Sequence, residues 1–259
     1  MRPGEIIENT LLKPDYYMVR FYAPEIARTA RPGQFVHVRI EENALQLLRR
    51  PFSIHDTTPD GAVTVVYKTV GAGTRRLAEK RPGEVCSLMG PLGTAYSPAP
   101  ADAIPVMVAG GYGSAAMYML TRSMPKPGIA LIGARSAADV ILDDRYRDAG
   151  CRVEIATNDG SLGTKGFVTA LVERVLAEHA GEKLFFYACG PHPMLMALAK
   201  IMKARGLSGE LSLDHLMCCG VGACFGCVVK VAADTPEGWA YARACKDGPV
   251  FDISRVYVD

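Results

Sequence analysis

Four cysteines near the end of the chain have the residue type and the spacing of a metal-cluster site. Cys219, Cys224 and Cys227 form a C-x4-C-x2-C run, and Cys245 follows further along the chain. This is the plant-type ligand pattern of a [2Fe–2S] cluster, in which four thiolates hold two irons. Glycines lie between these cysteines, where they let the backbone wrap closely and direct amide N–H groups at sulfur. Since such a cluster carries single electrons, we expect these four cysteines to be metal ligands in an electron-carrying protein.

The residues after the third cysteine predict how the fourth ligand returns to the other three. Residues 228–231 and 239–243 have the pattern of short strands, and the Thr-Pro-Glu-Gly run at 235–238 is typical of a turn. A hairpin of this kind would bring Cys245 back beside Cys227.

Structural zinc, disulfide bonds and a different first ligand are the alternatives at this site. Zinc sites more often contain two short C-x2–4-C hooks, whereas this chain has one. Disulfide bonds are disfavoured because nothing marks the chain as secreted. Cys218 directly precedes Cys219 and is an alternative first ligand, although the longer first gap fits less well. We interpret Cys86, Cys151 and Cys189, which lie far away in the sequence, by default as small buried hydrophobic residues.

Composition limits the class of protein. The chain has 259 residues, 49% of them hydrophobic, which is enough for two domains and a small module. Its net charge is only +2, without a long basic or acidic run, so no nucleic-acid partner is expected. The N-terminus has no apolar signal segment, and no stretch approaches about 20 uninterrupted apolar residues. We therefore expect a cytoplasmic protein without a membrane span, whose eight cysteines serve metal binding rather than disulfide bonding.

The first part of the chain, residues 1–98, has the pattern of a β-barrel. Short runs rich in β-branched and aromatic residues alternate with turns. A short helix is expected over 74–80, with Thr74 as its N-cap. This pattern predicts a small barrel that carries one helix. The expected strands include 17–21, 35–40 and 63–67.

The second part, residues 99–208, alternates strands with helices, and residues 209–259 hold the cysteine module. Such alternation predicts a parallel, doubly wound sheet. The predicted fold class is therefore a β-barrel domain, an α/β Rossmann-like domain and a small C-terminal cluster module. The expected strands of the α/β domain are 104–109, 129–134, 151–156 and 184–188, and the expected helices are one that ends at Arg122 and those over 138–147, 166–178 and 191–204.

Glycine-rich turns at the ends of two expected strands are candidate nucleotide-binding loops. Gly110-Gly111-x-Gly113 follows a strand and opens a helix, where glycine lets the backbone approach a pyrophosphate and the helix N-terminus favours its charge. Alone, this run is equally consistent with a plain tight turn. Cys189-Gly190-Pro191 also ends a strand and opens a helix. Because ligands of such sheets bind beyond the carboxyl ends of the strands, we expect both loops at one edge.

Two segments of the barrel domain are candidate phosphate-binding motifs. Arg50-Pro51-Phe52-Ser53 follows a strand-like stretch, and Val66-Tyr67-Lys68 ends a strand that leads to Gly73-Thr74 at a helix start. A basic side chain and a helix N-terminus could together hold phosphates. Taken singly, the first segment is better explained as a surface turn and the second as an ordinary glycine-rich helix entry. Together, ahead of a Rossmann-like sheet, they predict a flavin nucleotide.

These motifs resemble those of the ferredoxin–NADP reductase superfamily, whose members join an FAD-binding barrel to a pyridine-nucleotide domain. Arg50-Pro51-Phe52-Ser53 matches the family's R-P-x-S, which implies contacts to the flavin and its phosphates, and the run 71–74 matches the second FAD loop. Gly110-Gly111-x-Gly113 and Cys189-Gly190-Pro191 match the motifs of the nicotinamide side. The resemblance places Cys189 near the nicotinamide, and a buried inert thiol is the alternative. The first loop lacks the proline common in the family, and Tyr112 is bulkier than the usual residue.

The C-terminal cysteine run, with the later Cys-Lys-Asp-Gly-Pro, is similar to the electron transfer subunits of type B dihydroorotate dehydrogenases. The resemblance spans essentially the whole chain. It implies FAD, a [2Fe–2S] cluster and NAD as substrate, with electrons passing between NADH and an FMN-containing dihydroorotate dehydrogenase catalytic subunit. It also implies a heterotetramer that acts in pyrimidine biosynthesis. The alternative partner class is that of NAD(P)H–ferredoxin-type reductases, which contain related subunits.

No residue of the chain is assigned a catalytic role. Neither a Ser/His/Asp triad nor a carboxylate pair is evident, and the five scattered histidines are interpreted as structural. We expect the chemistry to belong to the cofactors, which the protein positions and tunes. A third hypothesis is a zinc-stabilised interaction protein that has kept a reductase fold, and a visible spectrum would distinguish it because zinc is colourless.

Overall fold

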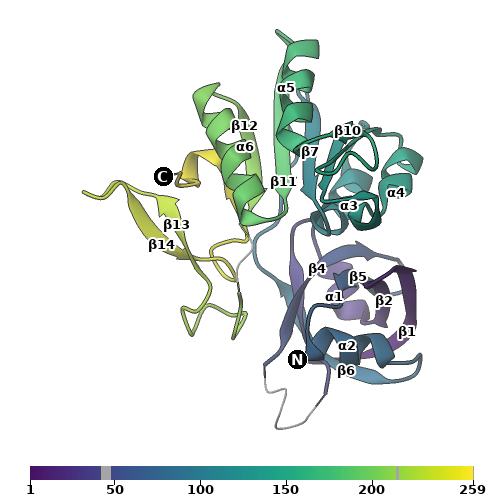
Figure 1. Ribbon diagram of the computed structural model, residues 1–259. Coiled ribbons are helices and arrows are strands. Elements are labelled where there is room, and N and C mark those ends of the chain that lie inside the picture. The colour runs from purple at the N-terminus through teal and green to yellow at the C-terminus, as the bar shows by residue number, and fades with distance from the viewer. Residues whose placement is uncertain (42–47, 214–215, 259) are drawn as a thin grey trace.

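The N-terminal part of the chain folds into a closed six-stranded barrel. Its elements are β1 (Arg2–Lys13), β2 (Tyr16–Tyr22), α1 (Pro24–Thr29), β3 (Phe35–Arg39), β4 (Arg50–Thr57), β5 (Ala62–Lys68), α2 (Ala72–Glu79) and β6 (Val85–Leu92). The strands close in the order β1-β2-β5-β4-β3-β6, all antiparallel, and Figure 1 shows the barrel below the sheet. The computed structural model describes residues 1–41, 48–213 and 216–258. The barrel is confirmed, but it carries two helices instead of one, because Pro24 supports an additional helix start.

The Arg50-Pro51-Phe52-Ser53 segment opens strand β4. The strand-like stretch expected before it falls largely on residues 42–47, which lie outside the described residues. Phe52 pairs with Val36 of β3, and the neighbouring pair joins the proline of the motif to His37. The motif is therefore held in a fixed register of the barrel wall rather than on a loop.

The following part of the chain forms the predicted sheet flanked by helices. Its elements are β7 (Ile104–Gly110), α3 (Gly113–Ser123), β8 (Ile129–Ala134), η1 (Ala137–Asp139), α4 (Asp143–Asp148), β9 (Arg152–Thr157), β10 (Thr164–Lys165), α5 (Val168–Glu178), β11 (Leu184–Cys189), α6 (His192–Ala204), β12 (Ser208–Ser212) and β15 (Val250–Asp252). The strand order is β10-β9-β8-β7-β11-β12-β15, parallel except for β15. Val106 and Val108 of β7 pack with α5 and α6, whereas Met107 and Ala109 pack with α3 and α4. This alternation places helices on both faces of the sheet (Figure 1).

One predicted helix is interrupted. The expected helix over 138–147 is divided into the 3-10 turn η1 and the short helix α4. Leu142 lies at the break with a φ of 63°, in the left-handed region that does not continue an α-helix. The interruption places Asp139, the last residue of η1, beside the barrel, where it accepts a hydrogen bond from Tyr16.

The C-terminal module contains the predicted hairpin, formed by β13 (Val228–Ala232) and β14 (Trp239–Arg243). Figure 1 shows this hairpin beside the end of the sheet and close to the C-terminus. The 3-10 turn η2 (Ile253–Arg255) directly follows β15. Strands β12 and β15 extend the sheet past residue 208, the expected domain boundary. The division at residues 98 and 208 stays a prediction. Within the described ranges, no helix is long and apolar enough to cross a membrane.

Candidate functional site

The four predicted cluster cysteines lie in the C-terminal module as two pairs of thiols. The side chains of Cys219 and Cys224 contact each other, and those of Cys227 and Cys245 form the second pair. The hairpin produces the second pair, because it brings the amide of Cys245 within 3.4 Å of Sγ of Cys227. Two pairs suit a two-iron cluster, in which each iron takes two protein ligands.

Backbone N–H groups point at all four sulfur atoms of these cysteines. Besides the amide of Cys245, the donors are Val221 to Cys219 at 3.5 Å, Gly222 to Cys245 at 3.1 Å and Gly226 to Cys224 at 3.4 Å. Gly220 and Gly222 have φ values of 72° and 81°, which turn the backbone in a way that other residues adopt only with strain. Amide donors stabilise thiolates, so the chemistry of this donor set fits an iron–sulfur cluster.

The surroundings shift the pKa values of Cys219 and Cys245, one thiol of each pair, in opposite directions. Burial raises the pKa of the Cys219 thiol, but hydrogen bonds from the amides of Val221 and Cys224 outweigh it and lower the pKa to about 6. Burial and the adjacent Cys227 thiol raise the pKa of Cys245. Metal ions would supply the positive charge that keeps both thiols of the buried pair ionised.

Cys218, the alternative first ligand, is exposed beside the first pair, and desolvation and the Cys224 thiol raise its pKa. The amide of Val221 donates to Cys219 rather than to Cys218. In the described part of the chain, no group of three or more His, Cys, Asp or Glu side chains is placed to hold a single metal ion. The arrangement in pairs accounts for this, because a binuclear cluster spreads its ligands over two metal ions.

An ion pair shapes the loop that carries the first three cysteines. Arg243 of β14 binds Asp247 through two hydrogen bonds of 2.9 and 3.0 Å, and it lowers the pKa of that carboxyl to about 2. The same guanidinium donates to the carbonyl of Gly222 at 3.1 Å and lies over the ring of Phe225. These contacts hold Gly222 where its amide faces Cys245.

The cysteine module packs directly against the barrel. Phe35 of β3 shares a buried apolar cluster with Cys227 and Cys245. His37, on the same strand, is fully buried and lies against Gly220 of the metal-binding loop. The candidate cluster site is therefore continuous with the wall of the barrel.

The two candidate flavin motifs meet in the structure although they are far apart in the sequence. A Cβ added to Gly73 would lie 3.0 Å from Nε of Arg50, so the guanidinium lies against the first turn of α2. Oγ1 of Thr74 accepts hydrogen bonds from the amides of Val70 and Gly71 at 2.9 and 3.1 Å, which orders the helix start. A guanidinium beside a helix N-terminus is suited to binding phosphate groups.

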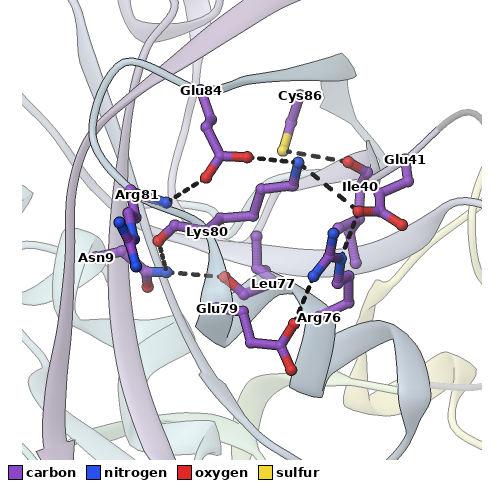
Figure 2. Close-up of polar contacts among 10 residues, drawn as sticks. All are labelled: Asn9, Ile40, Glu41, Arg76, Leu77, Glu79, Lys80, Arg81, Glu84 and Cys86. Carbon is purple, nitrogen blue, oxygen red and sulfur yellow. Dashed lines mark hydrogen bonds and ion pairs between the residues drawn. The ribbon is translucent and has the colours of Figure 1, made fainter.

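Side chains at the other end of α2 attach the helix to the barrel (Figure 2). Asn9 of β1 donates through Nδ2 to the carbonyls of Leu77 and Lys80 at 2.8 and 2.9 Å. Nζ of Lys80 lies 2.9 Å from a carboxylate oxygen of Glu84 and 3.9 Å from one of Glu41. Together these contacts fix the direction in which the N-terminus of α2 points.

Three residues of β5 that were predicted to contact the flavin point to different sides of the strand. Val66 is buried in an apolar cluster between the barrel and the sheet. Tyr67 packs in the barrel core, with its ring centroid 5.7 Å from that of Phe52. Lys68 forms an ion pair with Asp139 at 2.8 Å. Of the three side chains, only that of Lys68 lines a cavity that lies between the barrel and the sheet.

The two glycine-rich loops lie against each other at the carboxyl ends of the adjacent parallel strands β7 and β11, as predicted. A Cβ added to Gly113 would lie 2.2 Å from the carbonyl oxygen of Cys189. One added to Gly110 would lie 2.6 Å from Cδ of Pro191 and 3.3 Å from Cα of Gly190. Glycine is therefore required for the two loops to touch.

A cavity of about 570 Å³ opens in front of these loops, between the sheet and the barrel. Its position beyond the carboxyl ends of parallel strands and its size fit a nucleotide. Tyr16 and Asp139 were missed as site residues, because no local motif marks them and only the folded chain brings them to the cavity. The lining includes Tyr16, Lys68, Gly110, Gly111, Tyr112, Arg135, Asp139, Asn158 and Pro191.

A buried histidine joins the barrel to the sheet domain. Nδ1 of His55, on β4, lies 2.9 Å from the carbonyl oxygen of Ala115, and Nε2 lies 3.3 Å from Nη1 of Arg145. The imidazole stacks on Tyr118 with ring centroids 4.7 Å apart. Burial lowers the pKa of His55 to about 4, so the ring is neutral at pH 7. The neutral ring donates through Nδ1 and accepts through Nε2, which fixes the two domains at this point.

A closed barrel in front of a parallel, Rossmann-like sheet is the architecture of a flavin- and nicotinamide-dependent reductase, and the thiol module has the ligand set of an iron–sulfur cluster. Residues 214–257 match the family model of the iron–sulfur cluster binding domain of dihydroorotate dehydrogenase B. The chain is 38% identical over 253 residues to the dihydroorotate dehydrogenase B (NAD(+)) electron transfer subunit of Desulforamulus reducens, covering 96% of this chain and 95% of that protein. It is 40% identical over 232 residues to the subunit from Geobacillus kaustophilus, covering 87% and 86%. The chain belongs to this family of electron transfer subunits.

Two solved structures share the architecture. A structure of NADH-dependent reduced ferredoxin-NADP oxidoreductase, studied for flavin-based electron bifurcation, aligns with a TM-score of 0.84 at 28% identity, over 99% of this chain and 90% of that one. A ferredoxin reductase in carbazole 1,9a-dioxygenase aligns with a TM-score of 0.64 at 24% identity, over 79% and 65%. The predicted reductase fold is thus confirmed.

Proposed function

We propose that this chain carries electrons between NADH and an FMN-containing dihydroorotate dehydrogenase catalytic subunit, with which it forms a heterotetramer in pyrimidine biosynthesis. NAD-linked electron transfer through flavin and an iron–sulfur cluster, for a separate catalytic subunit, follows from membership of the family. The observation that carries the proposal is the arrangement of four thiols in two pairs against the wall of the barrel. Each of these thiols accepts a hydrogen bond from a backbone amide. Metal binding by four of the eight cysteines suits a reducing cytoplasm, in which thiols stay reduced.

Each part of the chain holds one group. When bound, FAD would supply hydride exchange with NADH, and the cluster would supply single-electron transfer. Arg50 and the start of α2 bind the flavin phosphates, and the Lys68–Asp139 pair and His55 keep barrel and sheet at a fixed separation. We assign FAD to Arg50, Pro51, Phe52, Ser53, Val66, Tyr67, Lys68, Gly73 and Thr74, NADH to Gly110, Gly111, Gly113, Cys189, Gly190 and Pro191, and the cluster to Cys219, Cys224, Cys227 and Cys245.

Apolar side chains exposed around the cysteine loop support a protein partner on this face. Leu216, Val221 and Phe225 are 86%, 47% and 62% exposed. Large apolar side chains gathered at a surface mark interaction sites. Cys224 is exposed on the same loop, so a subunit that covers these side chains would bring its own redox centre close to the cluster.

Reconstitution tests the proposal. The isolated chain with FAD bound should oxidise NADH with an artificial acceptor and should not turn over dihydroorotate. Adding the FMN-containing subunit should couple NADH to orotate, and the complex should elute as a heterotetramer in size-exclusion chromatography with light scattering. Turnover of orotate by the isolated chain at the rate of the complex would contradict the division of labour.

The second candidate is a reductase subunit of another flavoenzyme complex, of the NAD(P)H–ferredoxin type. The alignment with the NADH-dependent reduced ferredoxin-NADP oxidoreductase, which covers 99% of this chain, favours it. Affinity purification from the native cell, followed by mass spectrometry of the bound subunit, separates the two candidates. Recovery of a dihydroorotate dehydrogenase subunit supports the first candidate, and recovery of a different flavoenzyme supports the second.

A further inference from the structure

His37 of β3 lies between the candidate flavin strand and the candidate cluster loop. Its side chain is completely buried, and among the described residues neither Nδ1 nor Nε2 has a hydrogen-bond partner. Across the sheet, His37 pairs with Pro51 of the flavin motif. On the other side, a Cβ added to Gly220 would lie 2.5 Å from Nδ1 of the imidazole. One histidine therefore touches both sites.

The two buried ring nitrogens of His37 need a hydrogen-bond partner. Buried polar groups nearly always make hydrogen bonds, because an unpaired one lowers stability. In either protonation state, at least one nitrogen of the imidazole carries a hydrogen. The backbones of Cys219 and Arg49 both lie near the imidazole, but neither is in hydrogen-bonding geometry with it.

Gly220 is the residue that allows the approach. It has a φ of 72°, and a side chain there would meet Nδ1 at 2.5 Å, Cε1 at 3.1 Å and Cγ at 3.2 Å of His37. Phe35, two residues before His37 on β3, packs against Cys227 and Cys245 of the second thiol pair. Strand β3 thus supports both thiol pairs, and its neighbour β4 carries the flavin motif.

We propose that His37 is a positioning residue for the iron–sulfur cluster, whose ring N–H holds the Cys219–Gly220 segment against β3 beside the first ligand. The proposal rests on the assignment of Cys219 to the cluster under the proposed function. An N–H dipole whose positive end faces a ligand stabilises the reduced, more negative cluster, and so raises its reduction potential. The histidine would thereby favour electron transfer from the flavin to the cluster.

The reduction potential of the cluster tests this role. Wild-type holoprotein, His37→Leu and His37→Gln are compared by redox titration followed by electron paramagnetic resonance. His37→Leu removes the N–H, so we expect the equilibrium constant for reduction to fall about tenfold, which is about 59 mV for one electron. His37→Gln keeps a donor and should stay near the wild-type potential. Equal potentials in all three proteins, or an equal fall in both variants, would overturn the proposal.

Cluster content decides the outcome if His37→Leu cannot be titrated. Loss of iron and sulfide in His37→Leu, with FAD retained and the cluster kept in His37→Gln, supports the proposal, whereas equal loss in both overturns it. If neither variant folds, Gly220→Ala is compared in wild-type and His37→Ala backgrounds. A smaller loss of cluster in the second background supports the contact, and an equal loss overturns it.

Two controls separate this inference from the proposed function. His55→Gln changes an equally buried histidine of the same barrel that contacts Ala115 instead of the loop, and it should leave the cluster potential unchanged. A shift as large as that of His37→Leu would overturn the specific role of His37. Cys219→Ser tests the ligand assignment itself, because an intact cluster in that variant would contradict the proposed function whatever the behaviour of His37.

Discussion

The guanidinium of Arg50 lies against Gly73, so that a Cβ added to that glycine would be 3.0 Å from Nε and 3.3 Å from Cζ. Arg50 opens β4, and Gly73 lies in the first turn of α2. Two motifs that each have an ordinary local explanation thus form one cationic site at a helix start. The contact is the structural reason to assign the phosphates of the flavin to this place.

Replacing Arg50 by alanine should weaken FAD binding. The lost charge-assisted hydrogen bond is worth about 1.5–3 kcal/mol, or roughly a 10- to 150-fold rise in the dissociation constant. Titration of the apoprotein with FAD, followed by flavin fluorescence, measures the change. Arg205→Ala is the matched control, since the exposed guanidinium of Arg205, at the end of α6, pairs with Glu173 of α5. Equal affinity in Arg50→Ala and wild type would mean that the motif is only structural.

Gly113→Ala should separate the two nicotinamide-side loops. The added Cβ would meet the carbonyl oxygen of Cys189 at 2.2 Å, and backbone atoms cannot move aside as a flexible side chain can. Overpacking of this kind costs about 1–3 kcal/mol. We expect a higher Michaelis constant for NADH and a lower melting temperature, with FAD and iron contents unchanged. An unaltered NADH response would show that these loops do not form the nucleotide site.

Substitution of single cysteines should identify the cluster ligands. Wild-type protein prepared without oxygen should contain two irons and two acid-labile sulfides per chain. Cys224→Ser should lose the cluster and keep its flavin, whereas Cys218→Ala should keep both. Iron and sulfide analysis with a visible spectrum provides the measurement. Stoichiometric zinc without sulfide would exclude the cluster, and cluster loss in Cys218→Ala but not in Cys219→Ala would make Cys218 the first ligand.

His55 should make the stability of the protein depend on pH between 6.5 and 4. Its pKa falls from 6.5 to about 4 on folding, because burial disfavours the charged ring. The unfolded chain therefore binds a proton first as the pH falls, and the folded state loses about 2–3 kcal/mol between pH 7 and 4.5. His55→Gln cannot titrate and should lack this part of the dependence. Urea unfolding of both proteins at several pH values measures it, and identical slopes would contradict the neutral buried ring.

Sequence patterns predicted those parts of the molecule that depend on local order. The spacing of the cysteines and the turn at 235–238 anticipated that Cys245 returns to Cys227, because a hairpin fixes that pairing through its own turn. Alternation of strands and helices anticipated the sheet, and parallel strands necessarily bring their carboxyl-end loops to one edge.

Features that depend on tertiary placement could not be predicted in this way. Nothing in the local sequence indicates that Leu142 adopts a positive φ, yet this conformation ends the expected helix and leaves Asp139 at the barrel. The contact of His37 with Gly220 likewise joins segments that are distant in sequence. His37 was interpreted as structural because the five histidines are scattered along the sequence.

The most direct test of the account measures coupling through the cluster. The FMN-containing subunit is combined with the wild-type chain or with Cys224→Ser, and NADH oxidation is followed with an artificial acceptor and with orotate. We expect Cys224→Ser to keep the reaction with the artificial acceptor, because the flavin and nicotinamide sites are intact. Its reaction with orotate should fall to the background measured without this chain. Orotate reduction by the Cys224→Ser complex at the wild-type rate would contradict electron transfer through the cluster.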